Sequence, residues 1–194
     1  MNRPLPLLLV GLLTGCGMRH VPASALARLT EESRGELAEA ESSLALRIDE
    51  AEEAQAAIAA NRGAKRRAQS RLSAAIKEET KASEAEEQAH LSFLELEEQV
   101  ARARLEVEQR GSDCARLRLE QARVRVAVRE KVDGLGSLTA ESFEEGARRC
   151  EEEVKDRRAQ LSTRRGEAST ARDEWELRRS ENAGVGGAGS AYVQ

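Results

Sequence analysis

The chain has 194 residues, of which 34% are charged and only 2% are aromatic. So few large side chains cannot fill the core of an ordinary globular domain. The abundance of Ala, Glu, Arg, Leu and Gln is instead typical of long helices and coiled coils. The formal net charge of −4 is small for this length, which argues against a disordered, self-repelling chain.

The chain opens with a short apolar segment. Residues 5–13 follow a single basic side chain, Arg3, and are too few to span a bilayer as a stable helix. An apolar segment of this length behind a basic residue is typical of the core of a signal peptide. We therefore expect residues 1–15 to be a signal peptide.

The apolar segment ends in Leu13-Thr14-Gly15-Cys16, which resembles the lipobox of bacterial lipoproteins. The resemblance implies that the chain is exported, diacylated on the Cys16 thiol and cleaved before this residue. Residues 16–23 would then be the lipid anchor and a short linker. Gly17 follows the Cys, whereas an Asp there tends to hold members of this family at the inner membrane. The resemblance therefore implies the outer membrane more than the inner one, with the body facing the periplasm.

Residues 24–132 are predicted to form a long coiled-coil helix. Every seventh residue from Leu37, which we call heptad position a, is apolar at ten of fourteen positions. Every seventh residue from Ala40, which we call position d, is likewise apolar at ten of fourteen. A heptad held this long indicates a supercoiled helix, because a straight helix drifts out of phase. No Pro follows Pro22, so nothing forbids one continuous helix. Gly63 and Gly111 mark its possible breaks, although the unbroken heptad phase across both favours weak points inside a continuous helix.

The clearest break is the glycine-containing segment 133–138, which is predicted to be a loop. Thr139 is a suitable N-cap for a second helix over residues 139–182, and the glycine-rich residues 183–194 are predicted to be a flexible tail. A loop this short makes the two helices antiparallel neighbours. The predicted fold is therefore all-α, a long coiled-coil helix followed by a shorter antiparallel helix.

The second helix is long enough to cover only residues 93–128 of the first. The Ala-rich section at 51–89 is left without a partner. That section would either fold back near Gly63, which gives three helices, or pair with a second copy of the chain as a homo-oligomer. The sequence leaves both alternatives open.

The two cysteines other than Cys16 are predicted to form a disulfide. Cys114 lies at position a of the first helix and Cys150 at position d of the second, and these positions share a layer in an antiparallel pair. An even number of thiols in an oxidising compartment favours pairing. The register implies a reversal near residue 132, whereas the predicted loop is centred about three residues later. Free buried thiols and an intermolecular bond are the alternatives.

No residue pattern indicates a catalytic, metal or cofactor site, and we do not expect an enzyme. The only histidines, His20 and His90, have no acidic or Cys cluster at ligand spacing. A basic cluster could contact anionic lipid or nucleic acid, but nearby acidic residues indicate an ordinary mixed-charge helix face, and export argues against nucleic acid. This cluster comprises Arg62, Lys65, Arg66, Arg67 and Arg71.

The expected function is that of a lipid-anchored structural, scaffold or spacer protein of the bacterial cell envelope. It would contact the membrane through the lipid on Cys16 and act through contacts with envelope proteins. A continuous helix over residues 24–132 would reach roughly 160 Å at about 1.5 Å per residue. The alternative is a periplasmic chaperone-like or adaptor module that binds clients between helical arms.

Overall fold

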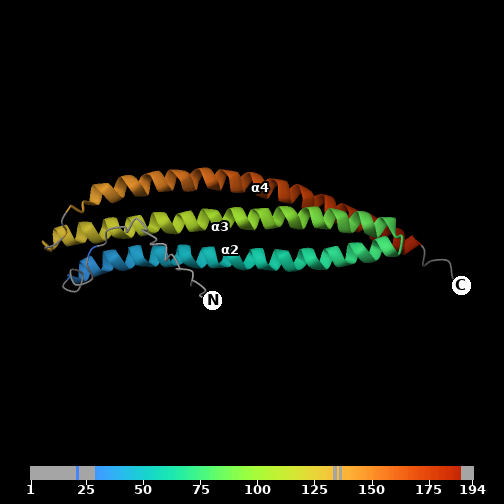
Figure 1. Ribbon diagram of the computed structural model, residues 1–194, viewed down its shortest axis with the longest axis horizontal. Coiled ribbons are helices and arrows are strands. Elements are labelled where there is room, and N and C mark those ends of the chain that lie inside the picture. The colour runs from blue at the N-terminus through green and yellow to red at the C-terminus, as the bar shows by residue number, and fades with distance from the viewer. Residues whose placement is uncertain (1–20, 22–28, 133–134, 136, 189–194) are drawn as a thin grey trace, which may run out of the picture.

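The computed structural model describes residues 21, 29–132, 135 and 137–188. These residues form three long helices, α2 (Glu31–Lys77), α3 (Lys81–Arg129) and α4 (Ala140–Ala188), and no strand. Successive helices run antiparallel, and α3 lies between α2 and α4 (Figure 1). The prediction of an all-α chain of antiparallel helices is confirmed, in its three-helix form.

The chain reverses between α2 and α3 at residues 78–80, so the prediction of one helix over residues 24–132 is wrong. Gly63 lies inside α2 and Gly111 inside α3, so neither glycine breaks its helix, as the unbroken heptad phase indicates. Glu79 has a left-handed φ of 55°. The amides of Glu79 and Thr80 donate to the carbonyls of Ile76 and Ala75, at 3.3 and 3.1 Å. This is the Schellman arrangement that ends many helices, with Glu in place of the usual Gly.

α3 ends in the same way. Lys131 has a φ of 54°, and the amides of Lys131 and Val132 donate to the carbonyls of Val128 and Ala127. Thr139 then caps α4, because its hydroxyl accepts from the amide of Ser142 at 3.4 Å. The loop prediction for 133–138 falls between α3 and α4, although residues 133, 134 and 136 lie outside the described residues.

α4 begins one residue after the predicted start and continues six residues beyond the predicted end at Asn182. Residues 183–188 are therefore helical, and that part of the predicted tail is wrong. Residues 189–194 lie outside the described residues.

The two outer helices pack on opposite sides of α3. The heptad positions a and d of α3 face α4, where Val107 and Cys114 form a buried cluster with Cys150, Val154 and Leu161. A second row of α3 faces α2, where Val126 packs with Leu29 and Leu37. Within the described residues α2 and α4 make no helix-to-helix contact with each other. The described helices therefore form a single layer with α3 at its centre.

α3 covers the Ala-rich section within the same chain. Ala54, Ala68 and Ala75 of α2 are all buried. Of the two alternatives that the sequence left open, the fold-back is the one found, although the reversal lies at residues 78–80 and not at Gly63. The seam that the other alternative would pair with a second copy is occupied by α3.

Charge is distributed in blocks that suit this topology. Residues 31–53 of α2 carry nine acidic and two basic side chains, and residues 54–77 carry six basic and none that is acidic. α3 is acidic over 81–98 and basic over 99–129, and α4 is acidic over 140–156 and basic over 157–188. Because each helix starts acidic and ends basic, antiparallel neighbours place opposite charges side by side, whereas parallel neighbours would place like charges together.

The bundle has two distinct ends. We call the end that holds the first residue of α2, the last of α3 and the first of α4 the loop end, and the end that holds the 78–80 turn and the last residue of α4 the turn end (Figure 1). At the loop end the hydroxyls of Thr30 and Ser33 each donate to the Glu130 carboxylate at 2.6 Å. These bonds hold the pKa of Glu130 below its ordinary value and tie the start of α2 to the end of α3.

Val21 is also held at the loop end. Its side chain is buried against Val124, Ala127 and Phe143, so this residue is packed on the ends of α3 and α4. None of the described helices combines the length and apolar character needed to cross a bilayer.

Candidate interaction surface

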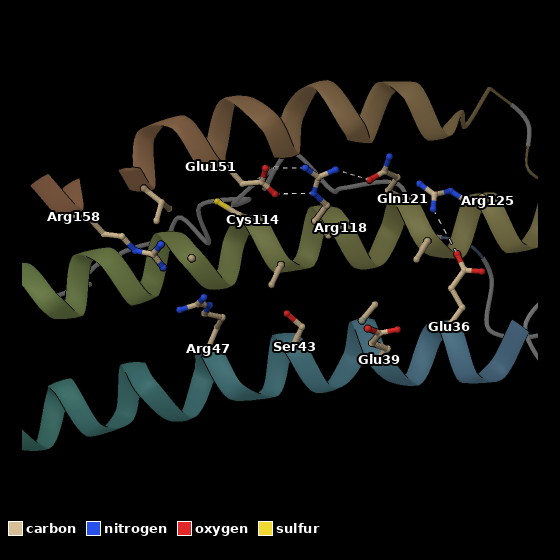
Figure 2. A pocket seen from close by; sticks show the side chains of 15 residues that line it. Glu36, Glu39, Ser43, Arg47, Cys114, Arg118, Gln121, Arg125, Glu151 and Arg158 are labelled. Atoms are coloured by element: carbon tan, nitrogen blue, oxygen red, sulfur yellow. Dashed lines mark hydrogen bonds and ion pairs between the residues drawn. The ribbon is translucent and has the colours of Figure 1, made fainter. Parts of the chain in front are cut away.

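A groove runs along one face of α3 between its two neighbours. It has a volume of about 550 Å³ and is lined by residues 36–47 of α2, 111–125 of α3 and 151–158 of α4. Figure 2 shows its side chains projecting from all three helices into the space between them. We call this feature the α3 groove. It exists because α2 and α4 both pack on α3 without meeting.

Small side chains form much of the α3 groove. Gly111, Ala115 and Ala122 of α3 line it together with Ala40 and Ser43 of α2. At Gly111 a Cβ atom would lie 3.4 Å from Cδ of Arg47. Arg47 lies across α3 at this position and reaches Glu108, at 3.1 Å.

Most of the charged side chains of the α3 groove are paired. Arg118 of α3 holds Glu151 of α4 through two hydrogen bonds of 2.7 and 2.8 Å, as Figure 2 shows. These bonds hold the pKa of Glu151 below its ordinary value. Arg125 lies 3.8 Å from Glu36 of α2. α3 is thus bridged to one neighbour by Arg118 and to the other by Arg125.

Two charged side chains of the groove have no ion-pair partner among the described residues. Glu39 on the α2 wall and Arg158 on the α4 wall make no ion pair or hydrogen bond with any described residue. They come from opposite walls and opposite ends of the groove, as Figure 2 shows. The α3 groove therefore has an open negative charge towards the loop end and an open positive charge farther along the bundle.

A disulfide joins α3 to α4 at the edge of the groove. It links Cys114 to Cys150, the pair that the sequence predicts, with Cα atoms 5.5 Å apart. Cys114 lies fifteen residues before the end of α3 and Cys150 ten residues after the start of α4. α3 therefore extends beyond the start of α4 by about five residues, or roughly 7 Å. This overhang accounts for the mismatch between the cysteine register and the centre of the predicted loop.

The basic cluster of α2 pairs with the acidic part of α3. Glu98 accepts hydrogen bonds from Arg102 at 2.5 Å, Arg62 at 3.2 Å and Lys65 at 3.3 Å. These bonds, that of Arg102 above all, lower the pKa of Glu98 to about 2. Arg71 likewise binds Glu87 through two hydrogen bonds. Arg62, Lys65 and Arg71 thus find their acidic partners on the neighbouring helix, and not in the acidic residues that follow the cluster in the sequence.

His90 lies in an aromatic cluster near the turn end, which the sequence did not predict. Its ring stacks on Trp175 of α4 at a centroid distance of 4.2 Å, and Phe93 stacks on the same ring at 5.6 Å. Arg71 of α2 approaches His90 Nδ1 at 2.9 Å. His90 of α3 thus contacts side chains of both α2 and α4.

Cys16, the expected lipidation site, and His20 lie outside the described residues. In the part of the chain that the structure describes, no three His, Cys, Asp or Glu side chains are grouped so that they could hold a metal ion.

The sequence interpretation also missed the α3 groove itself. One signal for it was present. Besides its a and d rows, α3 carries a second apolar row that includes Leu94, Leu119 and Val126, all buried. A helix with two apolar rows has two neighbours, and a groove can form between them.

Comparison of the chain with protein-family models, with curated proteins and with solved structures finds no match.

Proposed function

We propose that this protein is a lipid-anchored helical scaffold of the bacterial cell envelope. A lipid on Cys16 holds it at the membrane, the outer membrane rather than the inner one, and its body faces the periplasm and acts through contacts with other envelope proteins. The proposal is supported by the lipobox resemblance of Leu13-Thr14-Gly15-Cys16 and by a body that offers long helical surfaces. The Cys114–Cys150 disulfide suits an oxidising compartment.

The lipobox resemblance carries the proposal, and the position of Val21 sets the orientation of the body. Val21 lies five positions after Cys16, and five extended residues span at most about 18 Å. Because Val21 is buried at the loop end, a lipid on Cys16 would hold that end close to the membrane. The turn end would then point away from it.

The dimensions favour a short scaffold over a long spacer. α3 has 49 residues, which makes it roughly 73 Å long at about 1.5 Å per residue. The reach of roughly 160 Å expected for one continuous helix does not apply, because the chain folds back at residues 78–80.

An adaptor module remains the second candidate, and the α3 groove is the observation that favours it. A chaperone that grips unfolded clients is less well supported. Such a protein needs a contiguous apolar surface. The large apolar side chains that are exposed in the described residues are distributed over all three helices, and the groove carries ion pairs. These exposed residues are Leu46, Ile48, Ile76, Val128 and Leu177.

The anchor is tested by replacing Cys16 with Ser and following the protein from intact cells by detergent phase partitioning and by mass. The wild type should enter the detergent phase with the mass of a lipidated chain that begins at residue 16, and Cys16→Ser should do neither. The control is a chain in which Cys114 and Cys150 are both Ser, which keeps Cys16 and should stay lipidated. A Cys16→Ser variant that is processed and partitions like wild type would refute the anchor.

A further inference from the structure

We propose that the α3 groove binds one amphipathic helix of a partner protein, acidic at its N-terminal end and basic at its C-terminal end, which docks antiparallel to α2 and α4. This inference deepens the proposed scaffold role by naming the class of partner. Its physical basis is independent of the lipid, because every residue involved lies in the described helices.

The shape of the groove suits a helix. Packed helices approach to 8–10 Å between axes only when the residues between them leave room. Ala115 and Ala122 on α3, with Ala40 and Ser43 on α2, leave that room, whereas Arg47 lies across α3 at Gly111. A helix lying there would contact α2, α3 and α4 together and would turn the single layer into a four-helix arrangement. Its own face towards the groove should be made of Ala and other small apolar residues.

The length of the partner helix follows from the two open charges. Glu41, close to Glu39, pairs with Arg123, whereas Arg157, next to Arg158, pairs with Glu106. The two open charges are therefore separated by about 17 residues along α3, or roughly 25 Å. A helix of about 18 residues, or five turns, spans this distance.

The orientation follows from the signs of these charges. Glu39 lies towards the loop end and would form an ion pair with a basic side chain of the partner. Arg158, about five turns away, would form one with an acidic side chain. A helix is itself stabilised by acidic residues in its first turn and basic residues in its last turn. Both requirements are met together only if the C-terminus of the partner helix lies near Glu39. That orientation is antiparallel to α2 and α4, and it repeats the charge order of the three helices of this chain.

A second copy of the chain is a poorer occupant. A helix that enters the groove must bring a free apolar face, whereas α2, α3 and α4 each bury their apolar faces within their own bundle. The outer surfaces left to a second copy are rich in charge. We therefore assign the groove to a helix from another protein.

The test uses fluorescence anisotropy with two labelled synthetic peptides of about 18 residues and identical composition. One has Glu in its first turn, Lys in its last turn and an Ala-rich face, and the other has these charges exchanged. The protein is the full oxidised chain carrying Cys16→Ser. The Glu-first peptide should bind at least about threefold more tightly, the effect of two exposed ion pairs. A protein carrying Glu39→Lys and Arg158→Glu should reverse this preference. Comparing the two proteins cancels the difference in helicity between the peptides.

Two neighbouring serines give a matched steric test. Ser43 lines the groove and Ser42 does not, and both are exposed. Ser43→Phe should weaken peptide binding about tenfold or more, as expected for an obstructed contact, whereas Ser42→Phe should leave it within about twofold. Circular dichroism verifies that both variants are folded, and the charge-exchange variant provides an independent test if Ser43→Phe is not.

Several outcomes would overturn the proposal. These are no binding of the Glu-first peptide up to about 1 mM, an unchanged peptide preference in the charge-exchange protein, or equal effects of the two Phe variants. A dimer in sedimentation that Ser43→Phe dissociates would assign the groove to a second copy instead. None of these results depends on a membrane, so failure here is distinguishable from failure of the anchor.

Discussion

Breaking the Cys114–Cys150 disulfide should destabilise one side of the bundle and leave the other side largely intact. The bond joins α3 to α4 and closes a loop over a separation of 36 residues. α2 is held on α3 by a separate seam and, within the described residues, does not contact α4. Reduction should therefore act first on the docking of α4.

The size of the effect follows from loop closure. Cross-linking a loop of this length removes conformational entropy from the unfolded chain worth about 3–4 kcal/mol at 25 °C. If α4 detaches as a unit, the loss of this stabilisation of about 3–4 kcal/mol on reduction should lower the amide-exchange protection factors of α4 by two to three orders of magnitude. Protection around Ala54 and Ile58 of α2, which are buried against α3, should change far less.

The assay compares oxidised protein with protein reduced by a phosphine, both carrying Cys16→Ser so that only one thiol pair is present. Urea unfolding followed by circular dichroism gives the free energy difference, and hydrogen exchange with mass spectrometry locates it. Reduction keeps the sequence unchanged, so no substituted side chain disturbs the cluster around Val107 and Val154. Equal unfolding midpoints in the two states, or an equal loss of protection in α2 and α4, would refute the reasoning.

Three further predictions concern α3 and the turn before it. The folded-state pKa of Glu98, about 2, lies below its ordinary value of 4.5, so the stability that its ion cluster contributes is complete above pH 4.5 and is lost as the pH falls towards 2. The free energy of urea unfolding should therefore decline less steeply over this pH range for Glu98→Gln than for the wild type. Parallel pH curves for the two proteins would contradict the prediction. Val107→Ala should lower the free energy of unfolding by about 2 kcal/mol, because Val107 is 1% exposed. The control Val128→Ala on the same helix, at 60% exposure, should lower it by less than about 0.5 kcal/mol. Similar losses in the two variants would show that the seam is not where the structure places it. Glu79→Gly should raise the free energy of thermal unfolding by about 0.5–1 kcal/mol, since Glu79 has a left-handed φ. Glu79→Val should lower this free energy. A Glu79→Val variant that is more stable than the wild type would contradict the turn geometry.

The hairpin of α3 and α4 could be predicted from the sequence because its signals are local. Glycines mark the break after α3, Thr139 has the side chain of an N-cap, and Cys114 and Cys150 lie on rows that meet in an antiparallel pair. The overhang of α3 and the last six residues of α4 were missed, because the residues of a loop do not determine how far the helices on either side extend.

The reversal at residues 78–80 could not be predicted by the same rules. They look for Gly where a helix ends, and the left-handed residue here is Glu79. The heptad phase also continues from Leu72 to Phe93 through the turn, so no phase slip marked it. The change from a purely basic stretch over 54–77 to an acidic one over 81–98 was the usable signal. The ion pairs between α2 and α3 agree with a reversal at this change of charge.

The opposite placement of the two helix ends has a mechanical consequence. The first residue of α2 lies at the loop end and the last residue of α4 at the turn end (Figure 1). Tension applied between these residues acts along the helix axes, so neighbouring helices must slide past each other with many seam layers resisting at once, rather than separate layer by layer. The Cys114–Cys150 bond prevents the chain between these two residues from being extended by the applied force. Single-molecule stretching should therefore release more contour length after reduction, and it should do so at a lower force.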